Sequence, residues 1–179
     1  MTQNNELRLF GVANDSIVDG PGIRYVVFTQ GCTHACKGCH NPNSHALTGG
    51  FLKSIDEIIE EVDSNPLLDG ITLSGGEPLL QAKALISLCL EIKKRNLHII
   101  LYSGYTYEEI LRLGPHQKQL LSLCDMLVDG KFEIDKSSLS LLYRGSSNQR
   151  IINVQESLLQ HKVITYTINE NGIIENDIS

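Results

Sequence analysis

Short apolar runs alternate with helix-forming stretches along this chain of 179 residues, and that alternation limits the folds it can adopt. Strands are predicted at residues 25–30, 71–74, 97–103, 126–129 and 163–168, and helices at 54–64, at 79–95, in a short segment from 106 and at 116–124. Two of these helices open with a capping box, formed by Ser54 with Glu57 and by Thr106 with Glu109. Strand–helix–strand repetition with apolar strands predicts an α/β fold, with helices covering a mainly parallel sheet.

Charge and hydropathy argue against several classes of partner. The formal net charge of −6 offers no broad attraction to phosphate backbones, so we expect no nucleic-acid partner. No apolar run has the length that crossing a bilayer needs, so we expect no membrane partner. The N-terminal MTQNNELRLF lacks the pattern of a secretion signal, which predicts a cytoplasmic location. Because no repeat or Pro/Ser-rich linker divides the chain, residues 1–179 are predicted to form one domain, with 155–179 as a C-terminal extension that carries no usable motif.

The chemically unusual residues follow the predicted strands. A cysteine-rich loop follows the first strand, residues 75–77 (Gly-Gly-Glu) the second, 103–105 (Ser-Gly-Tyr) the third and 129–131 (Asp-Gly-Lys) the fourth. The carboxyl ends of parallel strands meet at one edge of a sheet, where functional loops collect. The sequence therefore predicts one shared site.

The cysteine-rich loop, QGCTHACKGCHNPNSH at 30–45, has the spacing C-x3-C-x2-C. Thiolates from one tight loop can bind a metal or cluster, and thiolate is the usual protein ligand of iron–sulfur clusters. Cys32, Cys36 and Cys39 can hold three irons of a [4Fe–4S] cluster and leave the fourth iron open.

A structural zinc site is the alternative for this loop. A ring nitrogen of His34, His40 or His45 could then complete a tetrahedral set of four ligands. Disulfides are not expected in a reducing compartment. Cys89 and Cys124 lie among leucines in helical stretches and are predicted to be small buried hydrophobes.

The turn LSGGEPL at 73–79 is the second candidate feature. Gly75 and Gly76 lack Cβ atoms, so the backbone can come close to a ligand, and Glu77 adds a carboxylate beside it. Such a turn suits the amino and carboxylate ends of an amino acid. The alternative is an ordinary strand-to-helix turn with Glu77 and Pro78 in the first helical turn.

C-x3-C-x2-C followed by Gly-Gly-Glu-Pro resembles the radical S-adenosylmethionine superfamily. The resemblance implies that Cys32, Cys36 and Cys39 hold a [4Fe–4S] cluster, and that the methionine end of S-adenosylmethionine chelates the open iron. It also implies that Gly75, Gly76 and Glu77 help bind the methionyl amino group.

Further segments resemble one branch of that superfamily. SIVDGPGIRYVVFTQGC (16–32) and CHNP (39–42) are similar to glycyl-radical-enzyme activases. VDGKF (128–132) and LYRGSSNQR (142–150) are similar to the activating component of anaerobic ribonucleoside-triphosphate reductase, and the resemblance runs from about residue 6 to residue 154. It implies reductive cleavage of S-adenosylmethionine to a 5′-deoxyadenosyl radical, which takes a hydrogen atom from a glycine of the reductase. The implied partners are the glycyl-radical subunit and a low-potential electron donor such as flavodoxin or ferredoxin.

The resemblance also suggests roles for residues at the other strand ends. Ser103 would meet the ribose or be a turn serine. Asp129 and Lys131 match acidic and basic positions near the site in related activases, or form a surface ion pair. His40 and Asn41 would line the cluster or contact adenine, or His40 would be a solvated loop residue.

Two features outside the strand ends have open interpretations. Arg24 would meet a carboxylate near the site or a partner surface, or be solvated. Residues 144–150 would close over the site, contact the reductase or form an ordinary surface loop.

The expected architecture is a curtailed (β/α)6-type partial TIM barrel of about six strands. The remaining functional alternatives are an activase of another glycyl-radical enzyme, a radical S-adenosylmethionine enzyme acting on a small molecule, and a zinc-stabilised binding module.

Overall fold

A computed structural model describes residues 5–169, 171–172 and 174–176 of the chain. Seven strands form one sheet in the order β3-β1-β2-β4-β5-β6-β7. The strands are β1 (Glu6–Ser16), β2 (Arg24–Thr29), β3 (Phe51–Ser54), β4 (Gly70–Gly75), β5 (His98–Ser103), β6 (Met126–Asp129) and β7 (Arg150–Asn153). The α-helices are α1 (Ile55–Ser64), α2 (Ala82–Lys94), α3 (Tyr107–Ile110), α4 (Pro115–Leu123) and α5 (Val154–Gln160). Short 3-10 turns are η1 (Pro42–Ser44), η2 (Pro78–Gln81) and η3 (Ile134–Lys136).

The centre of the sheet is parallel and its edges are antiparallel. Strands β2, β4, β5 and β6 pair in parallel, which confirms the four strands predicted before residue 130. β1 and β3 add antiparallel strands at one edge and β7 adds one at the other, so the sheet is mixed. These three strands were not predicted. In β1 the buried Leu7 and Leu9 alternate with more exposed residues, a weaker signal than the continuous apolar runs of the central strands.

The predicted helix starts are confirmed where a capping box marks them. The Ser54 hydroxyl accepts from the Glu57 amide at the start of α1, and Thr106 accepts from Glu109 in the same way at α3. Helix α2 begins three residues later than predicted, because the chain first makes the 3-10 turn η2. Helix α5 was not predicted.

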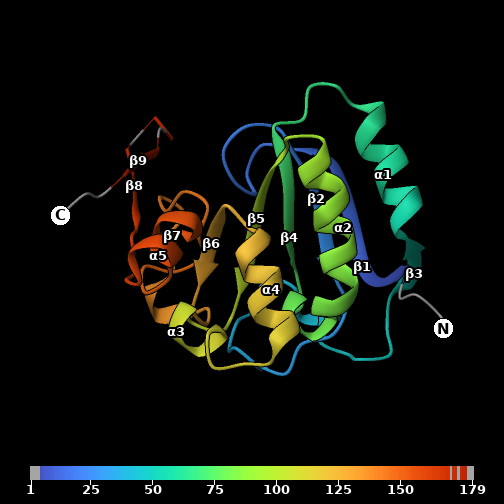
Figure 1. Cartoon of the computed structure of the whole chain (residues 1–179). Helices are drawn as coiled ribbons and strands as arrows, with labels where there is room; N and C mark the ends of the chain where they lie inside the picture. The colour runs from blue at the N-terminus through green and yellow to red at the C-terminus, as the bar shows by residue number, and fades with distance from the viewer. Residues whose placement is uncertain (1–4, 170, 173, 177–179) are drawn as a thin grey trace.

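The two faces of the sheet have different roles. Helices α1, α2 and α4 cover one face (Figure 1), and the main hydrophobic core lies beneath them. Along β5, Ile99 and Leu101 belong to that core, whereas Ile100 belongs to a smaller cluster on the opposite face, with Tyr102 packed against it. This alternation follows from the pleat of a strand. The opposite face is therefore left for the site.

The C-terminal part adds a small hairpin. β8 (Tyr166–Ile168) and β9 (Ile174–Asn176) form a separate antiparallel pair, and an isolated bridge joins Thr165 to Ile152 of β7. The strand predicted at 163–168 is confirmed in its second half. Residues 170, 173 and 177–179 of the C-terminal extension lie outside the described residues. Among the helices that are described, every one is too short or too polar to cross a membrane.

Arg24 lies at the start of β2, at the other end of the strand from the cysteine loop. Its side chain is 1% exposed. Its Nε donates to Thr72 Oγ1 at 3.2 Å, and its Nη2 donates to the carbonyl oxygens of His98, at 2.9 Å, and Ile71. Burial lowers the pKa of Arg24 to about 10. The solvated interpretation of Arg24 is therefore wrong: the guanidinium joins β2, β4 and β5 inside the protein.

Replacing Arg24 by alanine should lower the free energy of unfolding by about 2–4 kcal/mol, because buried acceptors lose their donor. Urea unfolding of the apoprotein measures the change. The exposed Arg112 is the matched control, and Arg112→Ala should stay within about 0.5 kcal/mol of the wild type. Equal stability of Arg24→Ala and Arg112→Ala would contradict this structural role.

Candidate active site

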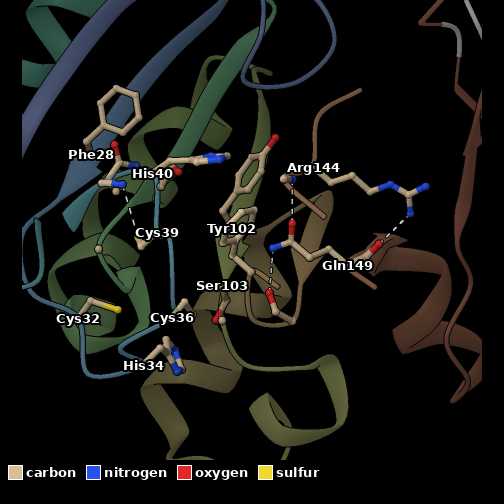
Figure 2. A pocket seen from close by; sticks show the side chains of 18 of the residues that line it. Phe28, Cys32, His34, Cys36, Cys39, His40, Tyr102, Ser103, Arg144 and Gln149 are labelled. Carbon is tan, nitrogen blue, oxygen red and sulfur yellow. Dashed lines mark hydrogen bonds between the residues drawn. The ribbon is translucent and has the colours of Figure 1, made fainter. Parts of the chain in front are cut away.

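A cavity of about 340 Å³ opens where the central strands end, on the face away from the helices. Figure 2 shows the cysteine loop on one side of it and Tyr102, Arg144 and Gln149 on the other. Eight of the eleven predicted site residues line it, namely Cys32, Cys36, Cys39, His40, Asn41, Gly75, Gly76 and Ser103. Glu77, Asp129 and Lys131 are not among the lining residues. The predicted meeting of the strand ends is thus observed, with three side chains placed elsewhere.

The cysteine loop is held by its own backbone and by the segment that follows. The Gly31 amide donates to Ser44 O at 2.7 Å and the Cys32 amide to His45 O at 3.1 Å. The Cys39 amide donates to Cys36 O at 3.2 Å, which closes a tight turn between these two cysteines. These hydrogen bonds therefore give the loop one backbone conformation.

The thiols of this loop fit an iron–sulfur cluster. All three are free, partly buried and directed to one cavity. The Asn41 amide donates to Cys39 Sγ at 3.4 Å, and the His34 amide hydrogen bonds to the Cys32 sulfur. Hydrogen bonds to ligand sulfurs are one way in which proteins tune cluster potentials. Burial raises the pKa of the Cys32 thiol.

The same residues do not form a site for one metal ion. Within the described ranges, no three His, Cys, Asp or Glu side chains are grouped so that they could hold a single ion. A [4Fe–4S] cluster has no such requirement, because each thiolate binds a different iron. Of the histidines considered as a zinc ligand, His34 contacts Glu77, and the ring of His40 packs on Phe132 with centroids 4.7 Å apart.

The Gly-Gly turn packs directly against the base of the cysteine loop. The Gly76 amide donates to Thr29 O at 2.8 Å, and the Glu77 amide donates to Gly31 O at 2.7 Å. Gly75 has φ +98°, and a Cβ there would lie 2.5 Å from Thr29 N. A Cβ on Gly76 would overlap the Gly31 carbonyl oxygen. Both glycines are therefore required by the close approach of the turn to the backbone at residues 29–31, whether or not a ligand also needs them.

Alanine at Gly76 should displace the cysteine loop, because the rigid Gly31 carbonyl has to move. We expect a loss of about 2–3 kcal/mol of stability, which lowers Tm by about 5–10 °C. After reconstitution, the variant should also hold less iron per chain than the wild type. Gly11→Ala is the control, since a Cβ on Gly11 meets no atom within 4 Å. A Gly76→Ala protein with normal Tm and iron content would show that this close approach is not needed.

Glu77 is fully buried behind the cavity wall. Its Oε2 accepts from the Gly104 amide at 2.9 Å and contacts His34 Nε2 at 2.7 Å. Its Oε1 accepts from the Leu79 amide at 3.1 Å and the Ser103 hydroxyl at 3.0 Å. The carboxylate therefore joins the cysteine loop, the start of η2 and the end of β5.

Ser103 lines the cavity, but its hydroxyl is already engaged on both sides. It donates to Glu77 and accepts from the Tyr105 amide at 3.1 Å. The turn-serine interpretation is thus observed, and a ligand would meet the hydroxyl from its cavity side.

Asp129 and Lys131 do not form the ion pair considered above. Asp129 is 1% exposed; it accepts from the Tyr107 amide at 2.7 Å and from Arg150 Nε at 3.0 Å. Arg150 also donates to Glu108 at 2.7 Å. Lys131 is exposed. Asp129 is therefore an anchor between the ends of β6 and β7.

Residues 144–150 build one wall of the cavity. Gln149 Oε1 accepts from the Gly145 amide at 2.8 Å, and its Nε2 donates to Gly130 O at 2.9 Å. Asn148 Nδ2 donates to Lys131 O at 2.8 Å. These bonds bind the segment to residues 130–131, so the two C-terminal motifs form one unit. The ordinary surface-loop interpretation is wrong for Gln149, which lines the cavity.

Sequence reasoning missed the aromatic residues of the cavity, which are Phe28, Tyr102, Phe132 and Tyr143. Tyr102 donates to Tyr143 O at 2.6 Å. Phe28 and Tyr102 alternate with core residues near the ends of predicted strands, so the period of two could have assigned them to the site face.

Comparison with known proteins defines the class of this protein. Residues 18–152 match the family model described as a 4Fe-4S single cluster domain. The cysteine loop, the Gly-Gly turn and the cavity wall at 144–150 all lie inside the matched range. The chain therefore belongs to the proteins with a single-cluster iron–sulfur domain.

Relatives identify the particular family. The anaerobic ribonucleoside-triphosphate reductase-activating protein of Haemophilus influenzae is 37% identical over 145 residues, covering 75% of this chain and 90% of the relative. The protein of the same name from Pasteurella multocida is 39% identical over 145 residues, with coverage of 75% and 90%. The chain belongs to the family of anaerobic ribonucleoside-triphosphate reductase-activating proteins. A solved structure, QueE from Escherichia coli, has 14% identity and a TM-score of 0.42, covering 56% of this chain and 53% of that chain.

Proposed function

We propose that this chain activates anaerobic ribonucleoside-triphosphate reductase as a radical S-adenosylmethionine enzyme. The observation that carries the proposal is the meeting of three free thiols and the Gly75–Gly76 turn in one cavity, in a chain of this family. Cys32, Cys36 and Cys39 would hold a [4Fe–4S] cluster. When bound and reduced, that cluster would supply the one electron needed to cleave S-adenosylmethionine to methionine and a 5′-deoxyadenosyl radical, which would take a hydrogen atom from a reductase glycine.

Cys32, Cys36 and Cys39 are the proposed cluster ligands, which leaves one iron for the cosubstrate. The other two cysteines are fully buried in the helix-side core. Burial raises the pKa of Cys89 to about 12. Cys89 and Cys124 are not among the residues that line the cavity, so they are not proposed as ligands.

The proposed cosubstrate residues divide into two groups. Gly75, Gly76, Ser103, His40 and Asn41 line the cavity and would contact S-adenosylmethionine there. Glu77 and Asp129 lie behind the wall and would hold the contacting segments in place, and Lys131 would act at the surface. The aromatic lining would limit the access of water to the cavity. A reactive carbon radical needs such exclusion so that it reacts only with its target.

Several broader features belong to the same proposal. Parallel neighbours β2, β4, β5 and β6, with helices on one face and the cavity on the other, support a curtailed (β/α)6-type barrel within one domain.

The five free thiols suit a cytoplasmic location. A flavodoxin or ferredoxin would supply the electron, and the acidic net charge argues against a nucleic-acid partner. We propose no membrane partner.

Anaerobic reconstitution with iron and sulfide tests the proposal, followed by electron paramagnetic resonance with and without S-adenosylmethionine. We expect a reduced [4Fe–4S] signal that changes when S-adenosylmethionine is added, and a glycyl radical once the reductase is present. Uptake of zinc without formation of such a cluster would contradict the proposed enzymatic function and would support a structural role for the three cysteines.

Cys36→Ala should abolish glycyl-radical formation, because one iron loses its thiolate. Cys89→Ala, in the buried core of α2, should retain it. The yield of glycyl radical per reductase, measured by electron paramagnetic resonance, compares the two. Radical formation by Cys36→Ala at the wild-type yield would overturn the cluster assignment.

A further inference from the structure

His34 lies inside the cysteine loop, between Cys32 and Cys36, and its side chain is only 8% exposed. Its Nε2 is 2.7 Å from Glu77 Oε2. The Gly104 and Leu79 amides also donate to this side chain, so both of its oxygens act as acceptors. Because an ionised carboxylate only accepts hydrogen bonds, Nε2 of His34 carries the donated proton.

The imidazole is also held by its neighbours. Its ring meets Tyr105 edge-on, with centroids 4.5 Å apart. A Cβ on Gly104 would overlap the ring, so glycine at this position makes room for it. The imidazole thus has one orientation, set by packing and a hydrogen bond together.

His34 joins the two halves of the proposed site. Its backbone amide hydrogen bonds to the Cys32 sulfur, while its side chain binds Glu77. Glu77 directly follows the Gly75–Gly76 turn. Backbone bonds from Gly76 and Glu77 reach Thr29 and Gly31, before the first cysteine, whereas His34 anchors the stretch between the first two cysteines.

We propose that His34 is a positioning residue, whose bond to Glu77 sets where Cys32 and Cys36 lie relative to the Gly75–Gly76 turn. This inference rests on the proposed function, in which the cysteines hold the cluster and the turn holds the methionine end of S-adenosylmethionine. A bond of this kind determines the distance between the cluster and its cosubstrate. Misplacement of reacting groups by about 1 Å is enough to slow a reaction about a hundredfold.

Two amide substitutions of His34 test the role. Glutamine places its side-chain nitrogen at about the reach of Nε2 and should keep the bond to Glu77. Asparagine is shorter, so its nitrogen falls short of the carboxylate. Both variants keep the backbone amide and a polar side chain, and the exposed His116→Ala is the control for loss of a histidine.

In the apoprotein, His34→Asn should speed amide hydrogen exchange in residues 32–36, while His34→Gln and His116→Ala should not. In the reconstituted enzyme, all variants should hold wild-type iron and sulfide. The Kd for S-adenosylmethionine, titrated by its effect on the reduced-cluster signal, should rise about tenfold or more in His34→Asn and recover in His34→Gln.

Equal Kd values and equal exchange in the Asn and Gln variants would overturn the positioning role. Loss of iron from a folded His34→Asn protein would overturn it too, because His34 would then serve to retain the cluster. Failure of the proposed function looks different, since the wild-type signal itself would not respond to S-adenosylmethionine.

Discussion

The buried carboxylate of Glu77 is the interaction on which the site depends. An ionised group inside a protein is costly unless hydrogen bonds compensate its lost hydration. Here the compensation comes from N–H and O–H groups of His34, Leu79, Ser103 and Gly104. These donors come from the cysteine loop, the start of η2 and the end of β5. The three segments must therefore meet at the Glu77 carboxylate for it to be stable in the interior.

The opposite wall of the cavity is built on the same principle. Asp129 is buried at the end of β6 and is compensated by Arg150 at the start of β7. Gln149 then bonds the loop before β7 to Gly130 after β6. Two buried carboxylates, one on each side of the cavity, hold the walls while the thiols and glycines remain exposed to it. Acidic side chains at strand ends thus support the site from behind instead of lining it.

Much of this arrangement was predictable from local pattern. Continuous apolar runs marked the four parallel strands, and capping boxes marked the starts of α1 and α3. The edge strands were harder, because β1 buries only alternate residues and β7 fully buries only its two central residues, whereas all four residues of β6 are buried. Glu77 and Asp129 were expected at the site. Whether each side chain points into the cavity or behind its wall depends on the backbone conformation of the turn that carries it. Residue spacing does not reveal that conformation.

The residue pattern alone reveals the chemistry: three thiols in one tight loop, two adjacent glycines after a strand, and parallel strands that bring such loops to one edge. The groups that support this chemistry become visible only in the folded chain. His34 and Glu77 are 43 positions apart, and Asp129 and Arg150 are 21 apart. Local periodicity encodes which face of an element is apolar. It does not encode the direction of a polar side chain in a turn, because that direction is set by donors contributed from distant parts of the chain.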